Sequence, residues 1–372
     1  MSRFFDRVSI PAREMGSYNP SPVPRQLPAE AASRLIYLDS NENPFGPSPC
    51  AIEAVRSALA VANFYPDDDS SKLRGKLAEV HDLPPEQVLV TAGSAGMLTL
   101  LCRTLLAPGL NAVTSALSFI VYSMVVHATG ARLIETPTPE HAFDLDAILR
   151  AINEDTRLVL LANPNNPTGT MLEAAAVDRF LERVPGHVVV VLDEAYYDFA
   201  SHFAALRAIE YSHSLAALRQ GKSVVVLRTF SKAHGLAGLR IGYGLGPAEL
   251  LAYCVRMRDT FSVSSLAEAA ALAALDDQQH ITRAVRNNAE EAKILEDGLS
   301  EAGFTVVPTS ANFVYCEVGE DASALADSLR GEGVSIRPLG GWGAPQAIRV
   351  TIGTPEQNRF FLKALRKVLR QG

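Results

Sequence analysis

The stretch SVVVLRTFSKAHGLAGLRIGYG, residues 223–244, joins an apolar run to a segment of small residues that carries one lysine and one further arginine. The run 223–228 is typical of a strand in a parallel sheet that is covered on both faces. Lys232 follows this run, and Arg240 comes eight residues later. Such a lysine is either a surface charge that happens to lie beside a strand or an amine held there for its chemistry.

Short apolar runs alternate with helical patterns on the N-terminal side of this stretch, which predicts a doubly wound α/β domain. After residue 265 a long Ala/Glu-rich helix, expected over 265–302, leads into a smaller α+β domain. We therefore predict an N-terminal arm with part of the small domain over 1–48, a large domain over 49–264 and a small C-terminal domain over 265–372. The other expected strands cover 87–93, 111–116, 131–136, 157–163 and 187–193, and the other expected helices cover 50–62 and 94–107.

The composition is that of an ordered globular chain, with 48% apolar and 20% charged residues among 372. The net charge of −7 gives no support to binding of nucleic acid or of an anionic membrane. No apolar run approaches the ~20 residues of a membrane span, and the N-terminus shows no secretory pattern. The four cysteines are scattered without metal-ligand spacing. We expect a cytoplasmic protein with reduced thiols and no metal site.

Polar residues follow four of the predicted strands, where a parallel sheet binds its ligands. Asp193 follows a fully apolar run, so its carboxylate needs a cationic or protonated partner, unless it simply caps the next helix. Lys232 can act as a nucleophile only if its pKa falls by about three units or if it is held covalently. Ser94 opens a helix after Gly93 and can bind phosphate there, although a plain capping serine looks the same.

One ligand satisfies these residues together. Pyridoxal 5′-phosphate (PLP) has a phosphate for Ser94, Ser231 and Arg240 and an aldehyde that condenses with Lys232. Its ring nitrogen can pair with Asp193. Its ring hydroxyl can be bound by two further polar side chains that follow the strands, Asn166 and Tyr196.

Seven stretches resemble fold-type I PLP-dependent aminotransferases of class I/II, and within them the histidinol-phosphate aminotransferase branch. The resemblance implies a large domain, with a mostly parallel sheet covered by helices, plus a smaller α+β domain. The stretches are LDSNENPFGPSP (38–49), FYPDDDSSKLRGKLA (64–78), TAGSAGML (91–98), NPNNPTGT (163–170), VLDEAYYDF (191–199), TFSKAHGLAGLRIGYG (229–244) and IRVTIGT (348–354).

The resemblance also implies roles for individual residues. Lys232 would bind the cofactor and carry the proton in catalysis, with Asp193 on the ring nitrogen and Asn166 and Tyr196 on the ring hydroxyl. Phe119 would stack on the ring. The phosphate would be held by Ser94, Ala95 through its backbone, Ser231, Arg240 and Tyr65, the last from the partner subunit of a homodimer. The substrate would be bound by Arg349, Asn43, Arg337 and Tyr18.

Three segments depart from the usual family pattern and leave the amino donor open. They are Gly-Ser-Ala-Gly at 93–96, phenylalanine in place of tyrosine at 119, and SYNPSPVP in the arm. Trp342, the single tryptophan, either packs in the core or faces the substrate.

The expected function is a PLP-dependent transaminase, with L-histidinol phosphate as donor and 2-oxoglutarate as acceptor, in histidine synthesis. An aromatic or other L-amino-acid aminotransferase is the close alternative. A PLP lyase such as a threonine-phosphate decarboxylase is a second class, and only a transaminase should accumulate pyridoxamine phosphate. A regulator that merely binds PLP is a third class, with no DNA-binding segment to support it.

Overall fold

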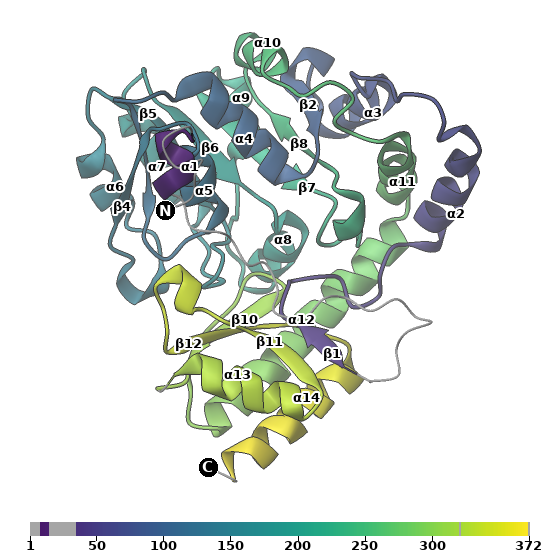
Figure 1. Ribbon diagram of the computed structural model, residues 1–372, viewed down its shortest axis with the longest axis vertical. Helices are drawn as coiled ribbons and strands as arrows, with labels where there is room; N and C mark the ends of the chain where they lie inside the picture. The colour runs from purple at the N-terminus through teal and green to yellow at the C-terminus, as the bar shows by residue number, and fades with distance from the viewer. Residues whose placement is uncertain (1–7, 15–34, 320, 371–372) are drawn as a thin grey trace.

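The computed structural model describes residues 8–14, 35–319 and 321–370, which form two sheets with their covering helices (Figure 1). The large sheet and its helices are drawn from blue to green, and the small sheet is mostly yellow. Each sheet has its own buried apolar core. The predicted α/β fold class is confirmed.

The large sheet has seven strands and is parallel except at one edge. The strand β8 runs antiparallel to both of its neighbours, β2 and β7, while the remaining pairs are parallel. Because β5, β6 and β7 are adjacent and parallel, their carboxyl ends lie at one edge. In spatial order the strands are β2 (Val88–Thr91), β8 (Gly242–Leu245), β7 (Val224–Thr229), β6 (Val189–Asp193), β5 (Thr156–Ala162), β3 (Asn111–Ser115) and β4 (Arg132–Thr136).

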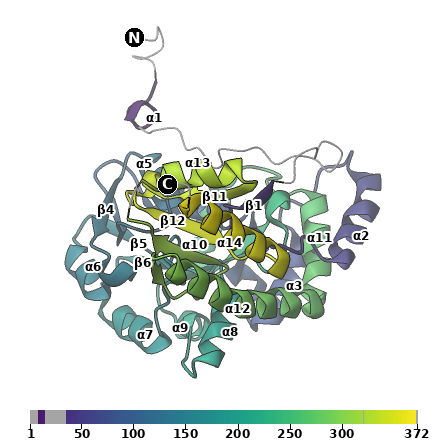
Figure 2. The same cartoon turned by 90° about the horizontal axis from the view of Figure 1, so that it is seen from below.

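Helices cover the large sheet on both faces, as the continuous apolar strands predict. The helices α2 and α11 pack side by side at one edge of the molecule (Figures 1 and 2). The helices of this part are α2 (Pro49–Ala58), α3 (Ser71–His81), α4 (Ser94–Leu105), α5 (Val121–His127), α6 (Leu145–Ala151), α7 (Ala174–Arg183), α8 (Tyr197–Leu206), α9 (Ser214–Arg219), α10 (Ala248–Arg256) and α11 (Ser265–Asp276).

The small sheet has five strands and draws one of them from the N-terminal side of the chain. That strand, β1, pairs in parallel with β11. The domain limits at 48 and 264 stay a prediction. The strands in spatial order are β1 (Ile36–Leu38), β11 (Val334–Pro338), β12 (Ala347–Thr351), β10 (Phe313–Glu317) and β9 (Thr305–Val307), and the remaining helices are α1 (Ile10–Glu14), α12 (Gln278–Glu301), α13 (Ala322–Gly331) and α14 (Pro355–Leu369).

Two of the differences between the structure and the sequence prediction concern β8 and the helix expected over 265–302. The strand β8 was not predicted, because glycines at 242 and 244 are unfavourable in strands. These glycines instead allow α4 to approach, since a Cβ on Gly242 would lie 2.8 Å from the backbone nitrogen of Ser94. The single helix expected over 265–302 is two helices, α11 and α12. Asp277 separates them, because its side chain caps α12 by accepting from the backbone N–H of His280 (3.1 Å).

None of the helices in the described part of the chain combines the length and the apolar character that crossing a membrane requires.

Candidate active site

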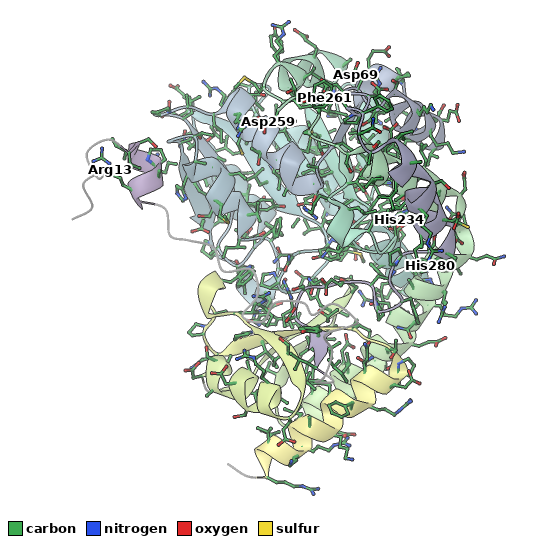
Figure 3. The ribbon with its side chains drawn as sticks, turned by 45° about the vertical axis from the view of Figure 1, so that its right-hand side comes forward. Arg13, Asp69, His234, Asp259, Phe261 and His280 are labelled. Atoms are coloured by element: carbon green, nitrogen blue, oxygen red, sulfur yellow. The ribbon has the colours of Figure 1, made fainter. Side chains whose placement is uncertain are left out.

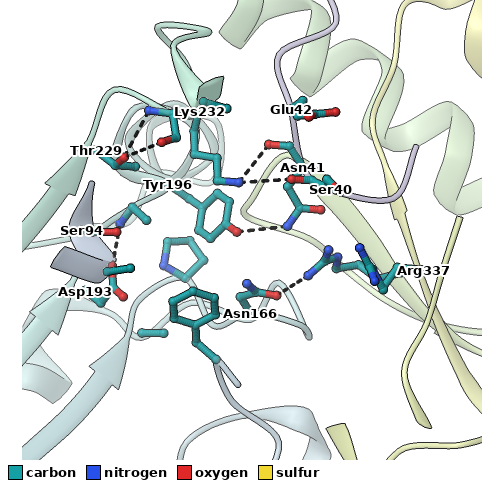
Figure 4. Close-up of a pocket in the computed structure, with 18 of the residues that line it drawn as sticks. Ser40, Asn41, Glu42, Ser94, Asn166, Asp193, Tyr196, Thr229, Lys232 and Arg337 are labelled. Atoms are coloured by element: carbon teal, nitrogen blue, oxygen red, sulfur yellow. Dashed lines mark hydrogen bonds between the residues drawn. The ribbon is translucent and has the colours of Figure 1, made fainter. Parts of the chain in front are cut away.

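A cavity of about 310 Å³ opens at the carboxyl ends of β5, β6 and β7, where the small sheet faces the large one (Figure 4). It brings together most of the residues that the sequence predicts for the site. The predicted residues in its lining are Ser94, Ala95, Phe119, Asn166, Asp193, Tyr196, Ser231, Lys232, Arg240, Arg337 and Arg349.

Lys232 extends from the loop after β7 into the cavity. Its Nζ lies 3.1 Å from the carbonyl oxygen of Asn41 and 3.4 Å from that of Ser40. Burial, with the nearby guanidinium of Arg349 acting in the same direction, lowers the pKa of Lys232 to about 7. At this pKa a large share of the amine is neutral at physiological pH, as a nucleophile requires.

The reactivity of Lys232 in the cofactor-free protein is a first prediction. Acetylation with acetic anhydride should rise with pH and reach half of its maximal rate near pH 7, because the amine is protonated below its pKa and neutral above it. Lys293 is an internal control, since its hydrogen bond to Asp297 raises its pKa above the usual value. Peptide mass spectrometry measures both rates. Equal pH profiles for the two lysines would contradict the assignment.

Asp193 ends β6 with both carboxylate oxygens engaged. Oδ2 accepts a hydrogen bond from Tyr122 Oη (3.1 Å), and Oδ1 accepts one from the backbone N–H of Ala195 (3.3 Å). Burial raises the pKa of Asp193 to about 6, and the hydrogen bond from Tyr122 opposes that rise. Asp193 is not the cap of α8, whose N-cap is Tyr196. The carboxylate is therefore available to a cationic partner in the cavity.

Asn166 and Tyr196 line the cavity, where Asn166 is bonded to Arg349 on β12 and Tyr196 to Asn41, which follows β1 (Figure 4). The Oη of Tyr196 accepts from Asn41 Nδ2 (3.0 Å). The Oδ1 of Asn166 accepts from Arg349 Nη1 (2.6 Å). Both side chains belong to the large-sheet part of the chain. Each can therefore donate to or accept from a ligand in the cavity while it keeps its hydrogen bond to Asn41 or Arg349.

Residues around the start of α4 form a concave site with donors for an anion. Gly93 has φ +79° and lies so close to Arg240 that a Cβ there would be 2.7 Å from Nη2. Ser94 begins α4, whose first backbone N–H groups have no partners within the helix. The hydroxyl of Ser231 adds a further polar group, bonded to Thr229 Oγ1 (3.0 Å). A helix N-terminus with an adjacent guanidinium is suited to a phosphate group.

Two arginines from adjacent strands form the wall on the side of the small sheet. Arg337 on β11 pairs in register with Arg349 on β12. Both are buried and donate to the carbonyl oxygen of Asp39, at 3.2 Å and 2.9 Å. The ring of Trp342 also lines the cavity, with its centroid 5.9 Å from the guanidinium carbon of Arg349. This wall is suited to anionic groups of a substrate.

Two predicted residues that the structure describes do not line the cavity. Asn43 is buried nearby and donates to the carbonyl oxygen of Ala233 (2.8 Å). Tyr65 is 82% exposed and stacks on Phe261 at 4.6 Å, at the end of the molecule away from the small sheet (Figure 3). Tyr18 lies outside the described residues.

Sequence reasoning missed four residues of the site. Ser40, Asn41 and Glu42 line the cavity, and the negative charge of Glu42 raises the pKa of Lys232 against the effect of burial. They lie in the stretch 38–49 that carries the resemblance, which is the signal that could have found them. Tyr122 lies three residues after Phe119, which precedes α5, and its backbone N–H donates to the carbonyl oxygen of Phe119 (2.9 Å). Among the described residues no cluster of His, Cys, Asp and Glu could hold a metal ion.

The residues of the cavity fit PLP. A half-buried lysine of lowered pKa, a buried carboxylate, and a helix N-terminus beside an arginine match its aldehyde, ring nitrogen and phosphate.

Comparison with known proteins gives the same result. The model of aminotransferase class I and II matches residues 33–365. A histidinol-phosphate aminotransferase 2 of Pseudomonas fluorescens is 43% identical over 94% of this chain and 92% of its own. The enzyme of that name from Pseudomonas aeruginosa is 41% identical over 99% of both chains.

Among solved structures, the histidinol-phosphate aminotransferase of Sinorhizobium meliloti in complex with PLP has a TM-score of 0.88 and 28% identity, and covers 99% of this chain and 98% of that one. The family predicted from the motifs is confirmed. The chain therefore belongs to the PLP-dependent class I and II aminotransferases and, within them, to the histidinol-phosphate aminotransferase family.

Proposed function

We propose that this protein is a transaminase that transfers the amino group of L-histidinol phosphate to 2-oxoglutarate in histidine synthesis. The observation that carries the proposal is the arginine wall formed by Arg337 and Arg349, which lines the same cavity as a half-buried lysine of lowered pKa. The relatives at about 40% identity are named for this activity.

PLP, when bound, supplies the electron sink that makes the donor's Cα–H bond acidic. The chain supplies the rest. Asp193 lies at the end of β6, where its carboxylate can hold a proton on the ring nitrogen, with Asn166 and Tyr196 placed for the ring hydroxyl. Ser94, Ala95, Ser231 and Arg240 would hold the phosphate and so orient the ring. Phe119, in the same lining, would be the stacking aromatic.

Lys232 moves the proton. A pKa of about 7 allows its amine to accept a proton from the donor's Cα and to return it at neutral pH, since general acids and bases work best near the operating pH. In the cofactor-free protein the carbonyl oxygens of Ser40 and Asn41 accept from this amine and orient it toward the cavity.

The arginine wall can bind both substrates in turn. L-Histidinol phosphate has no carboxylate, and its phosphate dianion matches two guanidinium groups. 2-Oxoglutarate has two carboxylates. Arg349 can bind the one beside the ketone, and Arg337 is placed for the distal one.

A phosphate-binding wall is also compatible with a lyase that acts on a phosphorylated amino acid. The L-threonine-O-3-phosphate decarboxylase of Porphyromonas gingivalis is 22% identical with a TM-score of 0.80, which shows the shared fold alone. The two classes differ in the fate of the cofactor, because a transaminase leaves it as pyridoxamine phosphate.

We also propose a cytoplasmic homodimer. Its support is a group of exposed apolar side chains around Tyr65, the residue that the family resemblance assigned to the subunit contact. Phe64 is 68% exposed and Phe261 is 43% exposed. Apolar surface of this kind is often covered by a partner. The four cysteines are free, which fits a reducing compartment.

Arg337→Gln tests the substrate assignment. The donor half-reaction with L-histidinol phosphate should slow about 10- to 100-fold, because a hydrogen bond to a charged group is worth about 1.5–3 kcal/mol. The half-reaction with L-phenylalanine, which has no phosphate, should change less than about threefold. Arg359→Gln, on the exposed face of α14, is the control. Single-turnover kinetics without 2-oxoglutarate keep the acceptor out of the comparison. Equal losses with both donors would count against Arg337 as a phosphate ligand.

A further inference from the structure

Tyr122 is a buried tyrosine behind the cavity, and the proposed reaction gives this tyrosine no role. It lies on α5, is 1% exposed, and points its hydroxyl at Asp193 Oδ2 (3.1 Å). Its ring meets that of Phe119 edge to face, with centroids 5.6 Å apart and planes at 82°. One side chain thus contacts both the residue assigned to stack on the cofactor ring and the carboxylate assigned to the ring nitrogen.

The hydrogen bonds around Asp193 fix the direction of its carboxylate. Tyr122 donates to Oδ2 and the backbone N–H of Ala195 donates to Oδ1, so each oxygen has one donor from the protein. A carboxylate held from both sides cannot rotate without losing one of these bonds. Each oxygen keeps acceptor capacity for a further donor, because a carboxylate offers about four lone-pair sites.

The groups around Asp193 and Tyr122 have opposing effects on the pKa of Asp193. Burial and the neighbouring Glu194 raise the pKa of Asp193, whereas Tyr122, the Ala195 N–H and Lys232 lower it. Tyr122 itself stays protonated, because burial and the carboxylate raise the pKa of its phenol well above the usual range. Tyr196 is the other titratable group that acts on Tyr122. Tyr122 is therefore a permanent donor, and hydrogen bonds to a carboxylate favour its charged form.

We propose that Tyr122 is a positioning residue for the reaction: its hydroxyl makes Asp193 a weaker base, so that the proton shared with the cofactor resides on the ring nitrogen. The inference rests on the proposed role of Asp193 but not on the identity of the amino donor. Without the hydroxyl, Asp193 becomes more basic and draws the shared proton to itself. The ring then withdraws electrons less strongly, and removal of the Cα proton slows.

Tyr122→Phe tests this, because it keeps the aromatic contact with Phe119 and removes only the hydroxyl. In holoenzyme loaded with ¹⁵N-labelled PLP, the ring nitrogen signal should move toward the value of unprotonated pyridine. The donor half-reaction should slow about 10- to 100-fold, the effect of losing one hydrogen bond to a charged group. Incorporation of 3-fluorotyrosine in place of Tyr122, a stronger donor, should move the signal in the opposite direction. This second variant also tests the proposal if the phenylalanine variant does not fold.

Tyr243→Phe is the matched control. Its hydroxyl is also buried and makes a hydrogen bond of 3.0 Å, but to His81. This variant should leave the nitrogen signal unchanged. An unprotonated ring in the wild type would overturn the role of Asp193 itself. A protonated ring whose signal does not respond to Tyr122→Phe would overturn only the role of Tyr122, as would an equal response to Tyr243→Phe.

Discussion

Replacement of Lys232 by alanine should lower the rate of transamination by about 10²- to 10⁴-fold. The amine is the only group in the described lining of the cavity that combines a pKa near 7 with a place at the carboxyl end of β7. Its loss removes both the covalent attachment of the cofactor and the base that moves the proton. Noncovalent binding of the cofactor phosphate should remain, because Ser94 and Arg240 are unchanged. The variant should therefore still bind PLP while failing to turn over.

Two measurements check this result. Stopped-flow absorbance of the bound cofactor follows the half-reaction, and equilibrium dialysis follows binding of PLP. Lys293→Ala removes an exposed lysine paired with Asp297 and serves as the control, with activity expected to be unchanged. A Lys232→Ala variant that keeps more than about one hundredth of wild-type turnover would refute the assignment, since acid–base catalysis alone contributes about 10²-fold or more.

Asp193→Asn should lower the half-reaction rate by about 10²- to 10³-fold, the usual cost of losing one preorganised electrostatic contact. Asparagine has nearly the same shape but no charge, so it cannot stabilise a proton on the ring nitrogen. Burial raises the pKa of Asp193 to about 6, because burying its charge costs free energy. The uncharged asparagine avoids that cost, so the variant should be folded. The loss should appear in the rate of Cα proton removal more than in the binding of substrate.

A primary deuterium isotope effect, measured with donor labelled at Cα, locates the loss. The isotope effect should be at least as large in Asp193→Asn as in the wild type, because proton removal becomes the slow step. Asp297→Asn, on the exposed face of α12, is the control. A variant that weakens substrate binding and leaves the rate of proton removal intact would place Asp193 outside the chemistry.

The central part of the site could be predicted from the sequence because it lies at the ends of apolar strands. Asp193 follows β6 and Lys232 follows β7, and adjacent parallel strands bring such residues to one edge. Their burial, and hence the direction of both pKa shifts, follows from the same pattern. Arg349 was placed by resemblance, and the structure shows it on β12, opposite Arg337.

The rest depends on long-range packing that no local pattern records. Asn41 and Glu42 reach the cavity from a segment without helical or strand periodicity, and Asn41 has φ +56°. Tyr122 acts across 71 positions of sequence, from α5 to Asp193. The strand β8 depends on glycines that local propensity assigns to turns. The placement of Tyr65 against a partner subunit stays a prediction.

The most direct test of the central claim is a single-turnover titration of the PLP-loaded protein, followed by the absorbance of the bound cofactor. The donors are L-histidinol phosphate, L-phenylalanine, L-glutamate and L-threonine phosphate. We expect L-histidinol phosphate to convert the cofactor to pyridoxamine phosphate far faster than L-phenylalanine or L-threonine phosphate, and L-glutamate, the product of the second half-reaction, to convert it as well. Faster conversion by L-phenylalanine would contradict the proposed donor, and failure of every donor to yield pyridoxamine phosphate would contradict transamination itself.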